Sequence, residues 1–150
     1  MKDIINFFEF DTNVLTGGQP SEGQIKALKE NGVEVMINLS PSSTRNYLAN
    51  EAEIAEKNGF IYFHLPVDCS NLQEYHFNSF KSVLNSVDGK KVFIHCGGNI
   101  KSSNLMHMYN VIEKGEDEGL SFDQLNKIQY PEDKWDGYFK KFGMKGFVGN

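Results

Sequence analysis

The alternation of apolar and polar positions along the chain predicts strands separated by helices. Short apolar runs rich in β-branched and aromatic residues lie at 33–39, 60–65 and 92–95. A further strand is expected before Ser21. Between the strands, apolar residues recur every three or four positions, which is typical of helices that bury one face. We therefore expect an α/β fold, a mostly parallel central sheet flanked by helices.

Capping residues and glycines indicate where the helices begin and end. Ser21 and Gln24 form a capping-box pattern, and Gly32 marks the end of the helix that they open. Ser121 and Gln124 repeat the pattern, and a last helix is expected after a proline. The apolar faces of the other predicted helices carry these residues: Leu48, Ala52 and Ala55; Phe80, Val83, Leu84 and Val87; Leu105, Met108, Tyr109 and Ile112; and Trp135, Tyr138, Phe139 and Phe142.

Three loops follow predicted parallel strands and contain polar side chains. They are 40–47, 66–71 and 96–101. Ligands of open parallel sheets bind outside the carboxyl ends of the strands, where such loops meet. We therefore expect one functional site that is built from these three loops.

The segment from Val92 to Ser103 carries the strongest indication of chemistry. An apolar strand ends at His95, Cys96 follows, and two glycines lead into a helix. Backbone N–H groups in such a turn, together with the N-terminal end of the helix, bind anions and favour the thiolate form of a cysteine. Lys101 at the helix start is electrostatically unfavourable unless an anion binds there.

We expect the loop to hold the oxygens of a phosphoryl group. Its glycines allow the backbone to approach a ligand closely, and an asparagine tolerates left-handed backbone angles. The residues in this role are Gly97, Gly98, Asn99, Ile100 and Lys101. The alternative is that Cys96 is a small apolar residue that fills space between strand and helix.

The neighbouring side chains fit cysteine-dependent phosphate chemistry. The Cys96 thiolate would attack phosphorus to give a thiophosphate intermediate that water hydrolyses, while His95 tunes the cysteine from the strand. Asp68 would protonate the leaving oxygen, and Ser102 would donate a hydrogen bond to the sulfur. Each has a structural alternative: a buried histidine, an aspartate that caps its own turn, and a helix N-cap.

The arrangement resembles the protein tyrosine and dual-specificity phosphatase superfamily, whose loop runs His-Cys, several residues, then Arg and Ser or Thr. It is most similar to a bacterial dual-specificity-phosphatase-like family, the beta-lactamase-hydrolase-like phosphatases, with a loop of the form HCAANxR. Further segments of that family correspond here to Gly17–Pro20, Met36–Leu39 and His64–Val67. The similarity extends from about Val14 to Ile112, and it implies a phosphotyrosine-phosphatase-like fold and a phosphoester hydrolase.

One position departs from the family pattern, because Lys101 stands where the family has arginine. Arginine grips two phosphoryl oxygens with a planar fork, whereas lysine is a point charge. By analogy with the loss of one transition-state donor, the barrier could rise by roughly 3–4 kcal/mol. Arg45 is the only arginine in the chain, and we hypothesise that it compensates in part from the same rim.

Two other functions remain open. The chain could be an inactive module that binds phosphate or another oxyanion, which the lysine favours, or a rhodanese-type sulfurtransferase with a persulfide on Cys96. Cys69, next to Asp68, suggests that oxidation could join it to Cys96.

Bulk properties favour one globular domain over residues 1–150. A formal net charge of −5 argues against a nucleic-acid surface, and only two cysteines suit a reducing, cytoplasmic compartment, although a removed leader would be invisible. No apolar stretch predicts a signal peptide or membrane span. We expect a phosphorylated protein or small phosphoester as substrate, and no metal or organic cofactor. The oligomeric state is left open.

Overall fold

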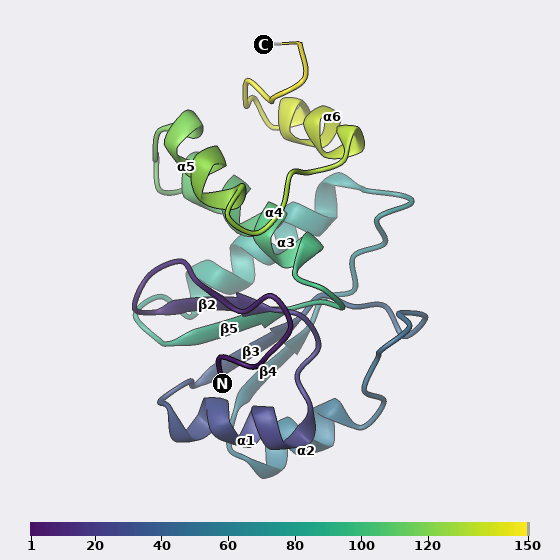
Figure 1. Cartoon of the computed structure of the whole chain (residues 1–150), viewed down its shortest axis with the longest axis vertical. Coiled ribbons are helices and arrows are strands. Elements are labelled where there is room, and N and C mark those ends of the chain that lie inside the picture. The colour runs from purple at the N-terminus through teal and green to yellow at the C-terminus, as the bar shows by residue number, and fades with distance from the viewer. Residues whose placement is uncertain (150) are drawn as a thin grey trace. The chain divides into compact units, whose positions relative to one another are not determined.

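The computed structural model describes residues 1–149, which fall into two compact units, Met1–Ser102 and Ser103–Asn150. The first unit contains the sheet (Figure 1). Its elements are β1 (Phe8–Glu9), β2 (Val14–Gly17), α1 (Glu22–Glu30), β3 (Val35–Asn38), α2 (Glu51–Lys57), β4 (Ile61–His64), α3 (Glu74–Ser86) and β5 (Val92–His95). None of the helices in residues 1–149 has the length and apolar character that a membrane crossing needs.

The sheet confirms the predicted α/β class. Its strand order is β1-β2-β5-β3-β4, and β2, β5, β3 and β4 pair in parallel. The prediction omitted β1, which pairs antiparallel with β2. A strand of two residues is too short to show an alternating pattern, so its pairing partner alone defines it.

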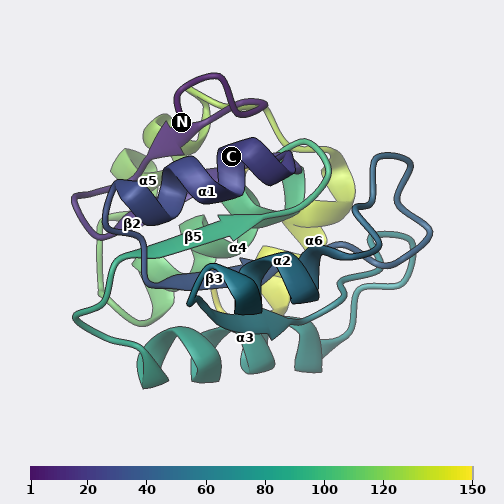
Figure 2. The same ribbon diagram turned by 90° about the horizontal axis from the view of Figure 1, so that it is seen from below.

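The helices of the first unit cover both faces of the sheet. Figures 1 and 2 show α1 and α2 on one face and α3 on the opposite face. Along the chain, β3 and then β4 are added on one side of β2, and β5 afterwards takes the position between β2 and β3. Because crossovers between parallel strands are right-handed, this reversal moves the helix to the other face. It also places β5 at the centre, with its carboxyl end between β2 and β3.

The apolar spacing that predicted α1 is confirmed in the core. Ile25 and Leu28 of α1 are fully buried, and they belong to one cluster with Met36 of β3 and Phe93 of β5. The capping box of Ser21 and Gln24 is also present, because each side chain bonds the other's backbone N–H. Each Å² of buried apolar surface contributes about 25 cal/mol to stability, so the packing of Ile25 and Leu28 in this cluster is the main contact that stabilises α1.

The helix predicted around Leu48 differs from α2 as observed. The helix begins only at Glu51, Ala52 is exposed, and the buried face consists of Glu51, Ile54 and Ala55. A glutamate on a buried helical face is not marked by apolar periodicity, which explains why the sequence pattern placed the face incorrectly.

The second unit contains helices only. α4 (Ile100–Ile112) begins at the end of the first unit, and α5 (Glu118–Leu125) and α6 (Asp133–Lys141) follow. The predicted capping box of Ser121 and Gln124 is wrong, because α5 starts earlier and Asp117 caps it by accepting a hydrogen bond from Leu120 N. Trp135, Tyr138 and Phe139 are buried, as predicted.

We predict that Gly18→Ala destabilises the protein. A Cβ at Gly18 would lie 2.6 Å from the carbonyl oxygen of Gly97 and 2.8 Å from Ile5 Cβ. Such overpacking costs roughly 1–3 kcal/mol of unfolding free energy, which urea denaturation measures. Gly23→Ala is the control: nothing lies within 4 Å there, and alanine in α1 should be neutral or stabilising by up to about 1 kcal/mol. Equal stabilities of the two variants would contradict the close approach.

Candidate active site

Cys96 directly follows β5, at the centre of the carboxyl edge of the sheet. Its backbone N–H donates to Gly17 O at 3.3 Å, which continues the pairing of β5 with β2 by one residue. The side chain is 1% exposed. Burial fits both a nucleophile at the base of a pocket and an apolar space-filling residue, so the surrounding loop has to distinguish them.

The carbonyl groups of the loop after Cys96 are held by donors from outside the loop. Gly97 O accepts from Gln19 N at 3.1 Å and from Asn46 Nδ2 at 3.0 Å, and Gly98 O accepts from Asn6 Nδ2 at 3.1 Å. In a trans peptide the N–H of the next residue points away from the carbonyl, so the anchored carbonyls of Gly97 and Gly98 direct the N–H groups of Gly98 and Asn99 to the opposite side. The carbonyl of Cys96 lies 3.3 Å from His95 Nδ1, which orients the N–H of Gly97 in the same way. Among residues 1–149, nothing accepts a hydrogen bond from the N–H of Gly97 or Gly98. These two donors are therefore available to an external acceptor.

Asn99 has a left-handed backbone, with φ of 69°, as predicted. Its side chain donates to Asn6 O at 2.8 Å and to Thr16 Oγ1 at 2.9 Å. In return, the Asn6 side chain donates to Gly98 O, so Asn6 is bonded in both directions to the segment Gly98–Asn99. The first residues of the chain and β2 therefore fix the loop, which sequence reasoning did not anticipate.

The loop leads directly into α4. Ile100 is exposed and is the first helical residue, Lys101 is half-buried, and Ser102 is buried. The alternative that Ser102 caps the helix is wrong, because Ser102 is its third residue. In the described residues, Ser102 Oγ has no hydrogen-bond partner. The start of a 13-residue helix also supplies backbone N–H groups that no helical carbonyl accepts.

Asp68 lies in the loop after β4, and its side chain is exposed. Its Oδ1 accepts from Ser70 Oγ at 2.6 Å and from Ser70 N at 2.9 Å, which is the turn that the structural alternative described. The Ser70 hydroxyl, then the Ser70 N–H and the positive charge of Lys101, hold the pKa of the Asp68 carboxyl below its usual range. The carboxylate is therefore ionised, and it lies within electrostatic reach of Lys101.

His76, which the sequence did not mark as a site residue, interacts electrostatically with Asp68 and Lys101. It is 5% exposed at the start of α3, and its Nδ1 accepts from Gln73 N at 3.0 Å, so Nε2 carries the proton. Burial lowers the pKa of His76; the charge of Asp68 raises it, and that of Lys101 lowers it. The spacing of Gln73 and His76 is that of a capping box, which was the available signal.

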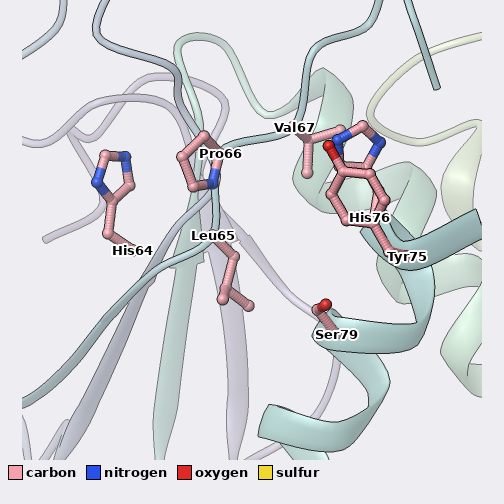
Figure 3. A pocket seen from close by; sticks show the side chains of 7 residues that line it. All are labelled: His64, Leu65, Pro66, Val67, Tyr75, His76 and Ser79. Atoms are coloured by element: carbon pink, nitrogen blue, oxygen red, sulfur yellow. The ribbon is translucent and has the colours of Figure 1, made fainter. Parts of the chain in front are cut away.

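A recess of about 150 Å³ adjoins these groups, between the end of β4 and α3. In Figure 3 the rings of Tyr75 and His76 lie against Val67, and Ser79 lies one turn further along the helix. Its lining residues are His64, Leu65, Pro66, Val67, Tyr75, His76 and Ser79. The tyrosine ring is 62% exposed, and it lies 4.3 Å from the ring of His76, between centroids. The recess is therefore mainly apolar and carries no lysine or arginine.

The third predicted loop also borders the cysteine loop. A Cβ at Gly97 would lie 3.0 Å from Thr44 Cγ2 and 3.2 Å from Asn46 Oδ1. Arg45, between those two residues, is exposed. The structure thus brings the loop of Arg45 beside Gly97, with Arg45 itself exposed.

Glu51 is the main residue that sequence reasoning missed. It is 1% exposed at the start of α2, and its carboxylate accepts from Gln19 Nε2 at 2.6 Å, from the Tyr62 hydroxyl at 2.7 Å and from His95 Nε2 at 2.8 Å. Burial alone would raise the pKa of Glu51, but the hydrogen bond and the charge of His95, and the hydrogen bonds from Tyr62 and Gln19, lower it. His95 is therefore a buried histidine, paired with a carboxylate.

Neither Cys69, which is half-buried, nor Cys96, which is buried, is in a disulfide, and a link between them under oxidation stays a prediction. Within residues 1–149, no group of three or more histidine, cysteine, aspartate or glutamate side chains could hold a metal ion.

Comparison with known proteins gives a consistent fold assignment. No known family profile matches the sequence, and no curated protein sequence matches it. A DUF442 protein from Shewanella putrefaciens CN-32, named as a candidate phosphatase, matches with a TM-score of 0.84 and 25% identity over 97% of this chain and 94% of its own. Tk-PTP in its active form matches with a TM-score of 0.77 and 16% identity, over 91% and 95% of the two chains. The catalytic core of the PP-IP phosphatase SIW14 from S. cerevisiae gives 0.76 and 13%, over 91% and 85%.

The chain therefore has the fold of the cysteine-phosphatase-like proteins. At these identities the similarity establishes the fold, and function has to be argued from the site.

We predict that Ser70→Ala raises the pKa of Asp68, because the largest cause that lowers it is the Ser70 hydroxyl. The midpoint of the Asp68 carboxyl, followed by ¹³C NMR against pH, should move toward that of a free aspartate. Ser82→Ala, at an exposed serine of α3, is the control and should leave the midpoint of the Asp68 carboxyl unchanged. An unchanged midpoint in Ser70→Ala would show that the turn does not govern the charge of Asp68.

Proposed function

We propose that the protein is a cysteine-dependent phosphoester hydrolase that acts through a thiophosphate on Cys96. The observation that carries the proposal is the anchoring of the Cys96 carbonyl by His95 and of the Gly97 carbonyl by Gln19 and Asn46, which leaves the N–H groups of Gly97 and Gly98 available beside the cysteine. A ring of N–H donors at a helix start is the usual environment of a phosphoryl group. The fold shared with phosphatases supports the same conclusion.

In the first step, the Cys96 thiolate attacks phosphorus, so that a sulfur–phosphorus bond forms and the bond to the leaving oxygen breaks. The N–H groups of the loop and the Lys101 ammonium balance the charge on the phosphoryl oxygens. The leaving oxygen takes its proton from Asp68. Because a bound phosphate dianion offsets the charge of Lys101, which lowers the pKa of Asp68, binding raises that pKa and favours the protonated acid.

In the second step, a water molecule attacks phosphorus and the sulfur–phosphorus bond breaks. The Asp68 carboxylate accepts the proton of that water, and phosphate is released. Ser102 Oγ, buried and without a partner among residues 1–149, supplies the hydrogen bond that stabilises the departing thiolate. His95 acts from behind the cysteine and does not contact the substrate.

The substrate is a phosphorylated protein or a small phosphoester whose alcohol part faces the recess beside Asp68. The recess has room for about one six-membered ring, since a cavity of roughly 150 Å³ holds benzene. Its walls favour an apolar leaving group over one that carries further phosphates.

A second function is favoured by two observations. Lysine replaces the bidentate arginine, and Asp68 is ionised in the free protein. Both features fit a module that binds a phosphate or another oxyanion but does not hydrolyse a phosphoester.

We predict that the protein hydrolyses a chromogenic aryl phosphate slowly, that Cys96→Ser abolishes turnover, and that Lys101→Arg raises kcat by about tenfold to a hundredfold. Arginine binds two phosphoryl oxygens at once, which strengthens contacts that form in the transition state. Lys90→Arg is the matched control, because Lys90 is exposed and precedes the opposite end of β5. No turnover in any variant, with phosphate still bound in calorimetry, would replace the hydrolase by the binding module.

We further predict that Arg45→Ala weakens phosphate binding several-fold, because the loop of Arg45 borders Gly97. Isothermal titration with inorganic phosphate measures the affinity, and Lys57→Ala, at an exposed lysine of α2, controls for loss of positive charge. An affinity equal to that of the unaltered protein would show that Arg45 does not compensate for Lys101.

A further inference from the structure

Both ring nitrogens of His95 face oxygen atoms. Nε2 lies 2.8 Å from Glu51 Oε2, and Nδ1 lies 3.3 Å from the carbonyl oxygen of Cys96. A carbonyl oxygen can only accept a hydrogen bond, so Nδ1 must carry a proton. Whether Nε2 carries one as well depends on the state of Glu51.

The other partners of Glu51 indicate an ionised carboxylate. The Tyr62 hydroxyl and Gln19 Nε2 donate to its two oxygens at 2.7 and 2.6 Å, so both oxygens act as acceptors. Tyr62 remains a donor, because burial and the neighbouring carboxylate raise its pKa. A carboxylate with three donors around it is stable as an anion even at 1% exposure, which makes Nε2 the third donor.

We infer that Glu51 is a positioning residue that holds His95 as a doubly protonated imidazolium immediately before Cys96. The inference concerns the thiol rather than the substrate, although its value for catalysis rests on the proposed hydrolase function. The charged and titratable groups that face His95 are Glu51 from α2 and Tyr62, behind it, from β4. On the strand itself, the ring of Phe93 stacks at 5.7 Å between centroids.

The imidazolium acts on the loop through one peptide group. Its Nδ1–H bonds the carbonyl of Cys96, and the N–H of Gly97 points in the opposite direction from that carbonyl. A positive charge on the carbonyl side polarises the peptide and strengthens the N–H as a donor. That donor is one of the two with no acceptor among residues 1–149. The buried charge thereby stabilises both the thiolate and the phosphoryl oxygens.

Gln19 connects this pair to the loop. Its side chain donates to Glu51, and its backbone N–H donates to Gly97 O at 3.1 Å. One residue of the segment after β2 therefore fixes the carboxylate on one side and the loop carbonyl on the other. Glu51, His95, Cys96 and Gly97 follow one another in space. Gln19 therefore holds the first member of this series, Glu51, and the last, Gly97.

The experiment measures protonation directly by NMR, which needs neither turnover nor access of a reagent to the buried thiol. Protein with ¹⁵N-labelled histidine and ¹³Cβ-labelled cysteine is prepared with Cys69→Ser, so that only Cys96 reports. We expect the ¹⁵N signals of His95 to show an imidazolium at pH 7. In Glu51→Gln, a near-isosteric change, His95 should be neutral, and the pH midpoint of the Cys96 signal should move up by about one unit, a tenfold smaller thiolate fraction below the midpoint.

Tyr62→Phe is the matched control. It removes one hydrogen bond to Glu51 but leaves the ion pair, so His95 should stay charged and the Cys96 midpoint should move by less than half as much as in Glu51→Gln. Glu51→Asp, which keeps the charge, should restore part of the shift that Glu51→Gln causes. A merely structural role would make both Glu51 variants and Tyr62→Phe lower thermal stability without moving the Cys96 midpoint.

Two results overturn the inference: a neutral His95 at pH 7 in the unaltered protein, or an unchanged Cys96 midpoint in a folded Glu51→Gln variant. The first needs no substitution, so the inference can be refuted even if Glu51→Gln does not fold. Failure of the proposed function has a different signature. In that case aryl phosphate is not hydrolysed, while the imidazolium signal and the shift in Glu51→Gln are both present.

Discussion

The site depends on hydrogen bonds that turn the carbonyl groups of one loop outward. Asn6, Gln19 and Asn46 come from three separate segments, and all of them donate to the carbonyls of Gly97 or Gly98. Without these donors, the peptides after Cys96 would be free to direct carbonyl oxygens toward a phosphoryl group and repel it. The proposed anion site is therefore a property of the surrounding fold as much as of the loop sequence.

Two electrostatic groupings lie around this loop and have different environments. Behind Cys96, His95 and Glu51 are buried and paired at 2.8 Å. In front of it, the charge of Lys101 lowers the pKa values of Asp68 and His76, and Asp68 raises the pKa of His76. The buried pair fixes a local field before any ligand arrives. In the proposed reaction the exposed grouping responds to the ligand, and Asp68 acts first as an acid and then as a base.

Much of the fold and the place of the site could be predicted from the sequence. The apolar runs located β3, β4 and β5, and the rule for parallel sheets brought Asp68, the loop of Arg45 and Cys96 to one edge. The left-handed backbone of Asn99 also followed from its residue type. Contacts between distant segments could not be predicted. Glu51 bonds His95 across 44 positions and Asn6 bonds Gly98 across 92, and no local periodicity marks such pairs.

In the proposed function, the N–H groups after Cys96 hold a tetrahedral or trigonal-bipyramidal oxyanion against its sulfur. A crystal of the protein soaked in vanadate tests this most directly. We expect vanadium bonded to Cys96 Sγ, with its equatorial oxygens within hydrogen-bond distance of the N–H groups of Gly97 and Gly98 and of the Lys101 ammonium. A crystal that excludes vanadate from this loop, with Cys96 Sγ enclosed by apolar side chains, would contradict it.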